Sequence, residues 1–264
     1  MKILKIGLIV FLSIYVVVCL ILYLMQEKLL FHPHQIPTDY TYQFSAEFEE
    51  INLNSNDNNL ILNGLYFKSV EKKGIVLFFH GNGGTVNDWG EGADFYTNLG
   101  YDIFYFDYRG YGKSGGKIKS EKQLMNDAKV AYEYVKTKFS EDKIIVSGTS
   151  IGTGMASQIA AVNNPRLLLL NTPYSSLVKL IRQKMKIVPS FLVKYKFKTT
   201  DYIESINCPI YVFHGDNDVV IPHSHSLELK ANHSKINLNI AEGFGHNDIT
   251  SSKLYNSKMI TILK

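Results

Sequence analysis

Short apolar runs separated by longer, more polar stretches recur along most of the chain, and this alternation limits the possible folds more than any other feature. Runs of this length are typical of parallel strands that are buried on both faces of a sheet. Six candidates share the pattern: GIVLFF (74–79), DIFYF (102–106), KIIVSG (143–148), LLLL (167–170), IYVFHG (210–215) and INLNI (236–240).

A hairpin is predicted before these runs. The strand-like stretches EFEEINL (47–53) and LILNGLYF (60–67) are separated by the polar stretch NSNDNN, which favours an antiparallel pair. In residues 119–139, apolar side chains recur every three or four positions, as in an amphipathic helix. Two antiparallel strands followed by strand–helix repeats predict an α/β fold, with a mostly parallel eight-stranded sheet and helices on both faces.

The N-terminus carries a different signal. Residues 6–25 contain no charged side chain, and a helix of about 20 apolar residues is long enough to cross a bilayer. A cleaved signal peptide would have a shorter apolar core and a small-residue cleavage site. A lipoprotein signal would need a small residue before Cys19, where Val18 stands. We therefore expect an uncleaved membrane anchor at 1–30, followed by one domain at 31–264.

The charges that flank the apolar run predict its orientation. Lys2, Lys5 and the amino terminus outweigh the charges that follow the run. This excess of positive charge before the run favours an N-terminus on the inner side of the membrane. The domain would then lie on the outer, periplasmic or extracellular, face. The formal net charge of +4 is too small to indicate binding of nucleic acid. The two cysteines, Cys19 in the apolar run and Cys208 in the domain, exclude a disulfide framework.

Residues 173–205 interrupt the strand–helix rhythm, and they combine basic with apolar side chains. No acidic residue occurs in this segment before Asp201. One interpretation is an ordinary amphipathic helix pair with a solvated basic face. The other is a short helical lid over the carboxyl edge of the sheet that also contacts anionic lipid headgroups. The basic residues are Lys179, Arg182, Lys184, Lys186, Lys194, Lys196 and Lys198.

Two serines match the pattern G-x-S-x-G, and their surroundings separate them. Ser150, in VSGTSIGTG, follows a strand-like run directly and precedes MASQIAAV, a strong helix former. A nucleophile elbow requires this order of strand, sharp turn and helix. Ser114, in RGYGKSGG, lies in a loop and is followed by two glycines, so no helix begins there. Ser150 is therefore the candidate nucleophile.

The same loop contains Gly-Lys-Ser, which invites comparison with a phosphate-binding loop. Such a loop needs a glycine five positions before the glycine of that triplet, and Asp107 occupies this position. The spacing therefore excludes a nucleotide-binding site of this type.

A serine hydroxyl needs a general base and an acid that orients the base. In folds with a nucleophile elbow, these residues follow the serine in the order acid, then histidine. Asp216 and Asp218 come just after the run 210–215, and His246 lies in the glycine-flanked stretch EGFGHND. Asp218 is preferred because a residue that directly follows a strand usually shapes the turn. We predict Ser150, Asp218 and His246 as the catalytic residues.

The other histidines and the glycine-rich loop have separate roles. LFFHGNGG (77–84) ends a strand in a loop that exposes backbone amides, so the Asn82 and Ile151 amides are the candidate oxyanion hole. His80 is expected to support this loop. His223 and His225 have no acidic or cysteine partner at ligand spacing and are expected to lie on the surface at a helix start. No metal or organic cofactor is expected.

The ordered motifs HGNGG, FDYRGYGKSGG, GTSIG, HGDNDVVIP and GFGHND resemble those of the α/β-hydrolase superfamily and cover nearly everything after residue 70. The resemblance extends to single-pass, membrane-anchored serine hydrolases, often called serine aminopeptidase-like. Their eukaryotic relatives include protein depalmitoylases and lipases acting on lysophospholipids or monoacylglycerols. The resemblance implies the α/β-hydrolase fold, the same three catalytic residues and a structural role for the loop around Ser114.

These observations together predict a membrane-anchored serine hydrolase that cleaves carboxylic ester or thioester bonds of acyl substrates through an acyl-enzyme. The expected partners are a small acyl substrate and membrane lipid, which the N-terminal helix and the basic insertion would contact. Two alternatives stay open. A serine peptidase would use the same three residues, and a catalytically silent hydrolase fold would serve as a membrane-bound interaction module.

Overall fold

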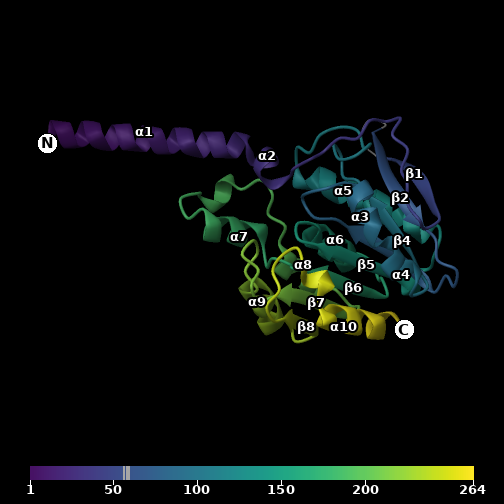
Figure 1. The fold of residues 1–264 in the computed structure, drawn as a ribbon. Coiled ribbons are helices and arrows are strands. Elements are labelled where there is room, and N and C mark those ends of the chain that lie inside the picture. The colour runs from purple at the N-terminus through teal and green to yellow at the C-terminus, as the bar shows by residue number, and fades with distance from the viewer. Residues whose placement is uncertain (56, 58–59) are drawn as a thin grey trace.

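The computed structural model describes residues 1–55, 57 and 60–264, and it contains one eight-stranded sheet (Figure 1). The strand order across the sheet is β1-β2-β4-β3-β5-β6-β7-β8. The strands β3 to β8 run parallel, and β2 is antiparallel to both of its neighbours. The strands are β1 (Phe48–Asn54), β2 (Ile61–Phe67), β3 (Gly74–Phe79), β4 (Tyr101–Phe106), β5 (Ile144–Thr149), β6 (Leu167–Asn171), β7 (Ile210–Gly215) and β8 (Ile236–Ala241).

The predicted α/β fold with its mostly parallel eight-stranded sheet is confirmed. Each apolar run forms a strand at the expected place, and every residue of β3 and β4 is buried. The predicted hairpin is the β1–β2 pair, in which Phe48 lies opposite Phe67 and Asn54 opposite Ile61. Of the polar stretch that was expected to form its turn, residues 56 and 58–59 lie outside the described part of the chain.

Helices cover both faces of this sheet (Figure 1). One face packs against α5 and α6, and the other packs against α4 and α10. The described helices are α1 (Lys2–Leu24), α2 (Gln26–Leu30), α3 (Val86–Trp89), α4 (Ala93–Thr97), α5 (Glu121–Lys136), α6 (Gly152–Ala161), α7 (Leu177–Lys184), α8 (Thr199–Ser205), α9 (Ser224–Asn232) and α10 (Lys253–Leu263). Short 3₁₀ turns are η1 (Gly90–Gly92), η2 (Glu141–Lys143), η3 (Ser190–Leu192) and η4 (Ile249–Ser251).

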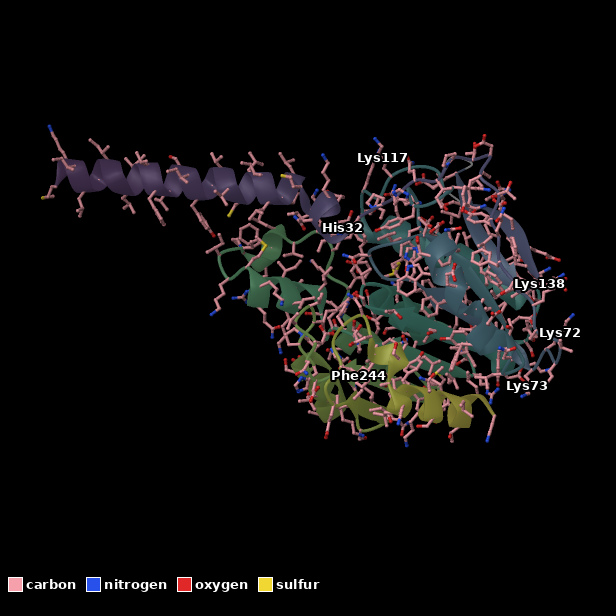
Figure 2. The ribbon with its side chains drawn as sticks, in the orientation of Figure 1. His32, Lys72, Lys73, Lys117, Lys138 and Phe244 are labelled. Atoms are coloured by element: carbon pink, nitrogen blue, oxygen red, sulfur yellow. The ribbon has the colours of Figure 1, made fainter. Side chains whose placement is uncertain are left out.

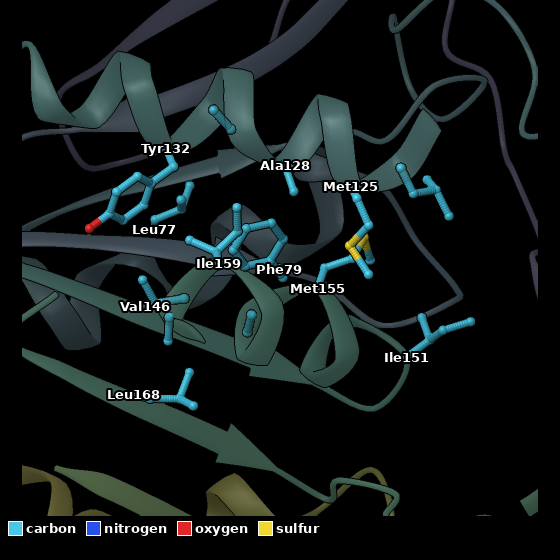
Figure 3. Packing of buried hydrophobic residues seen from close by; sticks show 14 of the residues in the cluster. Leu77, Phe79, Met125, Ala128, Tyr132, Val146, Ile151, Met155, Ile159 and Leu168 are labelled. Carbon is cyan, nitrogen blue, oxygen red and sulfur yellow. The ribbon is translucent and has the colours of Figure 1, made fainter. Parts of the chain in front are cut away.

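The core places α6 in a fixed position against the centre of the sheet. Figure 3 shows Phe79 of β3 beside Met155 and Ile159 of α6, on the side of α5 that carries Ala128. Met155 is fully buried, and so is Ala128 on the facing side of α5. The Ser120 side chain caps α5 by accepting a hydrogen bond from the Gln123 amide at 3.3 Å. Because α6 begins directly after β5, this packing determines where the turn between the two elements lies.

The N-terminal helix α1 projects from the body of the protein. Its mean hydropathy reaches 2.9, and only 6% of its most apolar window is buried, so it is long and apolar enough to cross a membrane. Figure 2 shows the side chains of its N-terminal half standing clear of the body, with His32 near the point where the chain enters the body. Phe31 beside it is almost fully buried and packs edge-on against Tyr195, with ring centroids 5.0 Å apart.

The insertion between β6 and β7 is helical in part, with α7, η3 and α8. Its residues after α7 extend away from the body and run beside the C-terminal half of α1 (Figure 1). Gln26 Nε2 donates to the Leu192 carbonyl at 2.7 Å, and the Lys194 amide donates to Gln26 Oε1 at 2.8 Å. The insertion is therefore packed against α1 and α2.

Candidate active site

Ser150 lies in a sharp turn between β5 and α6. Its φ of +54° is in the left-handed region, which a residue with a side chain adopts only when the surrounding structure holds it there. Its amide donates to the Asn171 carbonyl of β6 at 3.0 Å, and its carbonyl accepts from the Thr153 amide at 3.0 Å. The strand, the strained turn and the immediate helix are the geometry of a nucleophile elbow.

The two glycines that flank Ser150 are required by close packing in this turn. A Cβ at Gly148 would lie 2.7 Å from the Gly152 carbonyl oxygen, and a Cβ at Gly152 would overlap the carbonyl oxygens of Phe79 and His80. A side chain at either position would push α6 away from β3. This is the physical reason for the G-x-S-x-G pattern around Ser150.

The structure brings together the three residues that the sequence predicts as catalytic. His246 follows β8 in a loop, and its Nε2 lies 2.9 Å from Ser150 Oγ. Its Nδ1 lies 2.7 Å from Asp218 Oδ2. With a proton on Nδ1 donated to the carboxylate, Nε2 is free to accept the proton of the serine hydroxyl.

Asp218 is buried at the end of the loop after β7, and its charge is compensated. Its Oδ1 accepts from the Val220 and Ile221 amides at 2.8 and 2.7 Å. Burial by itself would raise the pKa of Asp218. Hydrogen bonds from His214, His246 and the Ile221 amide outweigh burial and hold this pKa well below its usual value. Asp218 is therefore a carboxylate throughout the neutral range.

His214, the penultimate residue of β7, belongs to the same network and was missed in the sequence. Its Nε2 lies 3.1 Å from Asp218 Oδ2 and 2.8 Å from the Ile221 carbonyl oxygen. Its Nδ1 lies 2.6 Å from Ser226 Oγ. The available signal was a histidine four residues before the acid, at the carboxyl end of a strand. This histidine was overlooked because it lies in the apolar run IYVFHG, which was interpreted only as a strand.

The other candidate acid, Asp216, is turned away from His246. Its Oδ1 accepts a hydrogen bond from the Gly243 amide at 2.7 Å. Gly243 has a φ of +80° in the turn that leads to His246. Asp216 therefore shapes a turn, as a residue directly after a strand was expected to do.

The Asn82 and Ile151 amides, predicted as the oxyanion hole, lie on two adjacent loops of the same edge. Asn82 lines the cavity beside Ser150, and Ile151 directly follows Ser150. The Asn82 carbonyl is held by the Tyr111 hydroxyl at 2.9 Å and by the His32 amide at 3.2 Å. These contacts fix the peptide planes of the loop and so orient its amides.

His80 supports this loop from below, in the role expected for it. Its ring is fully buried and stacks on Tyr108, with centroids 4.0 Å apart. Its Nδ1 lies 2.7 Å from the Gly81 carbonyl oxygen. Burial lowers the pKa of His80 to about 4, so the ring is neutral near pH 7. Among the described residues, no hydrogen bond or ion pair joins it to Ser150 or His246.

Ser114 and His225 are both buried. Ser114 Oγ donates to the Asp107 carbonyl at 2.7 Å and accepts from the Asn63 amide at 2.8 Å, so it braces its loop. The expectation that His225 lies on the surface is wrong. Its ring contacts Ser175 and Gln183 at 2.9 and 2.8 Å because α9 packs against the start of the insertion. His223, at the start of α9, is partly exposed as expected.

A cavity of about 600 Å³ opens beside Ser150 and His246. The position predicted for the lid is wrong with respect to this cavity, since none of residues 173–205, all of which the structure describes, line it. Several apolar side chains of the insertion face α1 and α2 instead, namely Ile181, Met185, Val188, Leu192 and Val193. The cavity walls come from α3, α4, η4, α10 and the adjoining strands, and six aromatic residues dominate them: Phe78, Trp89, Phe95, Tyr96, Tyr105 and Tyr255.

The described residues contain no group of three or more His, Cys, Asp or Glu side chains arranged to hold a metal ion. The chemistry that the site supports with its own residues is attack by Ser150 on an electrophilic carbon, with His246 as the base.

A family profile described as "Serine aminopeptidase, S33" matches residues 70–202. The matched segment contains Asn82 and Ser150 and ends before Asp218. Alpha/beta hydrolase domain-containing protein 17B of Xenopus tropicalis is 34% identical over 188 residues, which are 69% of this chain and 63% of that protein. Its human counterpart is 33% identical over 188 residues, which are again 69% of this chain and 63% of that protein. The chain therefore spans about 63% of the length of these curated relatives.

Solved structures share the fold at lower identity. An esterase from Pyrococcus furiosus has a TM-score of 0.70 and 22% identity, covering 89% of this chain and 97% of the esterase. An alpha-beta hydrolase from Vibrio vulnificus has a TM-score of 0.68 and 23% identity, covering 81% of each chain.

Proposed function

The chain belongs to the serine aminopeptidase (S33) family of α/β-hydrolases, and on this premise we propose that it is a membrane-anchored serine hydrolase of acyl esters or thioesters. The observation that carries the proposal is the line of contacts from Ser150 Oγ through His246 to Asp218, with distances of 2.9 and 2.7 Å. These contacts join residues that are distant in sequence and place a base at hydrogen-bond distance from a strained serine.

In the first half of the reaction, Ser150 Oγ bonds to the acyl carbonyl carbon while its proton passes to His246 Nε2. Asp218 stays ionised and stabilises the imidazolium. The negative charge on the carbonyl oxygen is held by the Asn82 and Ile151 amides, and each such donor contributes about 3 kcal/mol to lowering the barrier. The bond to the leaving group then breaks, and the alcohol or thiol departs with the proton from His246.

The second half of the reaction releases the acyl group from Ser150. His246 takes a proton from water, and the resulting hydroxide bonds to the acyl carbon. The carbonyl oxygen again gains its negative charge in the same amide pair. The bond to Ser150 Oγ breaks, the carboxylic acid leaves, and the serine recovers its proton from His246. The step consumes one water and needs no metal or organic cofactor.

The cavity supports an acyl substrate. Its volume of about 600 Å³ lies within the range of small-ligand sites, and its walls are mainly aromatic. An apolar chain that enters it leaves water, which is favourable by about 25 cal/mol per Å² of buried apolar surface. Ser150 and His246 are polar residues that line the same cavity, and the reacting carbonyl of the substrate would lie beside them.

A peptidase remains the enzymatic alternative, since a peptide bond needs the same three residues. An aminopeptidase also needs a carboxylate that binds the free amine of its substrate. Asp88 is the one acidic side chain among the described lining residues, and it accepts from the Thr85 amide and hydroxyl at 2.7 and 3.1 Å. Because Asp88 caps α3 in this way, the cavity favours an ester or thioester.

The domain organisation that we propose has a membrane anchor at 1–30 and a hydrolase domain at 31–264. Lys2 and Lys5 precede the apolar part of α1, which favours an N-terminus on the inner side and a hydrolase domain on the outer face. In this arrangement, the enzyme works on substrates that concentrate at the membrane surface.

The proposal is tested by labelling the detergent-solubilised protein with a fluorophosphonate probe and mapping the modified peptide. Ser150→Ala and Ser114→Ala variants serve as a matched pair, because both serines stand in G-x-S-x-G. We expect label on Ser150, its loss in the Ser150 variant and its retention in the Ser114 variant. Esters, thioesters and amino-acid amides of graded size then define the substrate class.

Two results would contradict the proposal. Folded wild-type protein that takes up no label would favour the silent interaction module. Faster turnover of amino-acid amides than of acyl esters by the labelled enzyme would favour the peptidase.

A further inference from the structure

We propose that residues 185–193, the insertion tip, enter the membrane beside α1 and form a second membrane contact. The inference rests on the membrane anchoring by α1 proposed above. It goes beyond that anchoring, because it assigns a lipid contact to a loop of the hydrolase domain. The apolar N-terminal run by itself does not indicate such a contact.

The insertion tip is held against one face of α1. The Tyr15 hydroxyl donates to the Ile187 carbonyl at 2.9 Å, although the two residues are 172 positions apart in sequence. Cys19 is the buried residue of α1, and Tyr15, Val18 and Leu22 are the partly exposed residues nearest to it along the helix. Spacings of three and four residues place all of them on one side, which the insertion covers.

The position of Tyr15 on α1 sets the depth of the insertion tip. Tyr15 lies near the middle of the uncharged run 6–25. It stands nine residues before Leu24, at the end of α1, which corresponds to about 13 Å along the helix axis. The half-thickness of a bilayer hydrocarbon core is about 15 Å. If α1 spans the bilayer, a loop that contacts Tyr15 cannot stay in water and must enter the leaflet that contains the C-terminal half of α1.

The side chains of the insertion tip suit this location. Phe191 is 83% exposed and Ile187 is 58% exposed, so two large apolar groups face outward beside the apolar surface of α1. Met185 adds a third, with 37% exposure. Together with the flank of α1, they form one continuous apolar surface, and such surfaces mark membrane or protein contacts. The continuity with α1 identifies the lipid as the partner.

The backbone of the insertion tip is satisfied in part by contacts within the protein. The Ile187 and Leu192 carbonyls accept from side chains of Tyr15 and Gln26. The Val188, Leu192 and Val193 amides donate to carbonyls three residues earlier, and Pro189 has no amide hydrogen. Backbone groups that enter lipid need such partners because no water is available there.

Basic side chains surround the insertion tip where headgroups would lie. No acidic residue occurs between 173 and Asp201. Lys194 pairs with Glu27 at 3.1 Å, whereas Arg182 and Lys186 make no ion pair with any described residue. Each basic group near an anionic membrane contributes about 1 kcal/mol of attraction. Long lysine and arginine stems can also lie along apolar surface while their charges stay at the headgroup level.

The test uses full-length protein in vesicles, with an environment-sensitive fluorophore on single cysteines introduced into a Cys19→Ala, Cys208→Ala background. Phe191→Cys reports on the insertion tip, and Val16→Cys, 62% exposed on α1, reports on the anchor. Val70→Cys is the matched control. It is 99% exposed and lies beside Lys72 and Lys73, which Figure 2 shows on the side of the body away from α1. Quenchers attached to lipid acyl chains then report immersion.

We expect lipid quenchers to reduce the emission of the labels at positions 16 and 191 and to leave the label at position 70 unchanged. Quenching at 16 without quenching at 191 would overturn the proposal while leaving the anchor in place. No quenching at either position would overturn both. None of these readouts depends on Ser150, so the hydrolase proposal stands or fails separately through its labelling test.

The basic groups are tested in the same samples. Vesicles that contain anionic phosphatidylglycerol should quench the label at position 191 more strongly than vesicles of phosphatidylcholine alone. Lys186→Glu should reduce this difference. Equal quenching in both lipids would contradict the role of the basic residues.

Discussion

His214 Nε2 lies 3.1 Å from Asp218 Oδ2, the same carboxylate oxygen that faces His246. The other neighbour of this nitrogen is the Ile221 carbonyl at 2.8 Å, which can only accept, so Nε2 of His214 carries a hydrogen. His214 therefore donates to Asp218 from inside the protein, opposite His246. It acts through the carboxylate as a positioning residue for the catalytic acid.

The first prediction concerns this contact. His214→Phe should lower kcat roughly tenfold to a hundredfold, because a hydrogen bond to a charged group contributes about 1.5–3 kcal/mol. KM should change little, since His214 is not among the residues that line the cavity. His214→Gln, whose amide can donate from a similar position, should recover part of the lost kcat. Equal losses in the two variants, or a loss confined to KM, would indicate a merely structural role.

The second prediction separates the two acids of the loop. Asp218→Asn should lower kcat by about 10⁴, because the imidazole of His246 loses its anionic partner and its correct tautomer. Asp216→Asn is the matched control, since Asp216 contacts the Gly243 amide instead of His246. Steady-state kinetics with one ester substrate compare the variants. A larger loss in the Asp216 variant would show that the acid is misassigned.

The third prediction concerns the cavity. A Cβ at Gly92 would lie 3.5 Å from the Tyr105 hydroxyl, and both residues line the cavity. The Cβ of a substituted residue therefore has room at this position, and Gly92→Leu should take up space in the cavity. We expect kcat/KM for long-chain esters to fall by about tenfold or more relative to an acetyl ester, since a few displaced methylenes cost at least 1–3 kcal/mol.

Val219→Leu is the control for this substitution, because Val219 is 79% exposed and does not line the cavity. A uniform loss for all chain lengths in the Gly92 variant would mean that the acyl chain lies elsewhere.

The fourth prediction concerns stability against pH. Burial, with smaller contributions from Lys179 and His214, lowers the pKa of His225 to about 4, although Glu228 and Asp218 act to raise it. Its Nδ1 faces both the amide and the hydroxyl of Ser175, so a proton on this atom would oppose the amide hydrogen. Between about pH 4 and 6.5, the unfolded chain therefore binds one more proton at this site than the folded protein does.

As a result, the free energy of unfolding falls as the pH is lowered through this window, by about 1.4 kcal/mol per pH unit for this group. His225→Asn removes the titrating ring and keeps a side-chain acceptor near Ser175. Denaturant unfolding in detergent at several pH values should give a correspondingly shallower slope for the variant. Parallel curves for the two proteins would refute the assignment.

The strands were largely predictable, because their signals are local. GIVLFF became β3 at residues 74–79 and IYVFHG became β7 at 210–215, with both ends as expected. A short run of apolar residues between turn-forming residues has few other ways to bury both faces. The elbow around Ser150 was predictable for the same reason, since two glycines and a following helix former describe one continuous turn.

The insertion shows where this reasoning fails. Its alternating basic and apolar residues indicated a surface with an apolar side but not the partner of that side. The structure places it against α1 and not over the cavity, because Gln26 and Tyr15 supply hydrogen bonds to it from the N-terminal segment. A sequence pattern carries no information about which distant element completes an amphipathic surface.

The sequence by itself determined the strand order along the chain, the strained turn at Ser150 and the order of the three candidate catalytic residues, because each depends on neighbouring residues and backbone geometry. Only the tertiary structure decided that His246 meets both Ser150 and Asp218, that His214 lies behind the acid, and that His225 is buried. These relationships join side chains from separate strands and loops. Their distances follow from how parallel strands pair at one edge of the sheet, which no local pattern specifies.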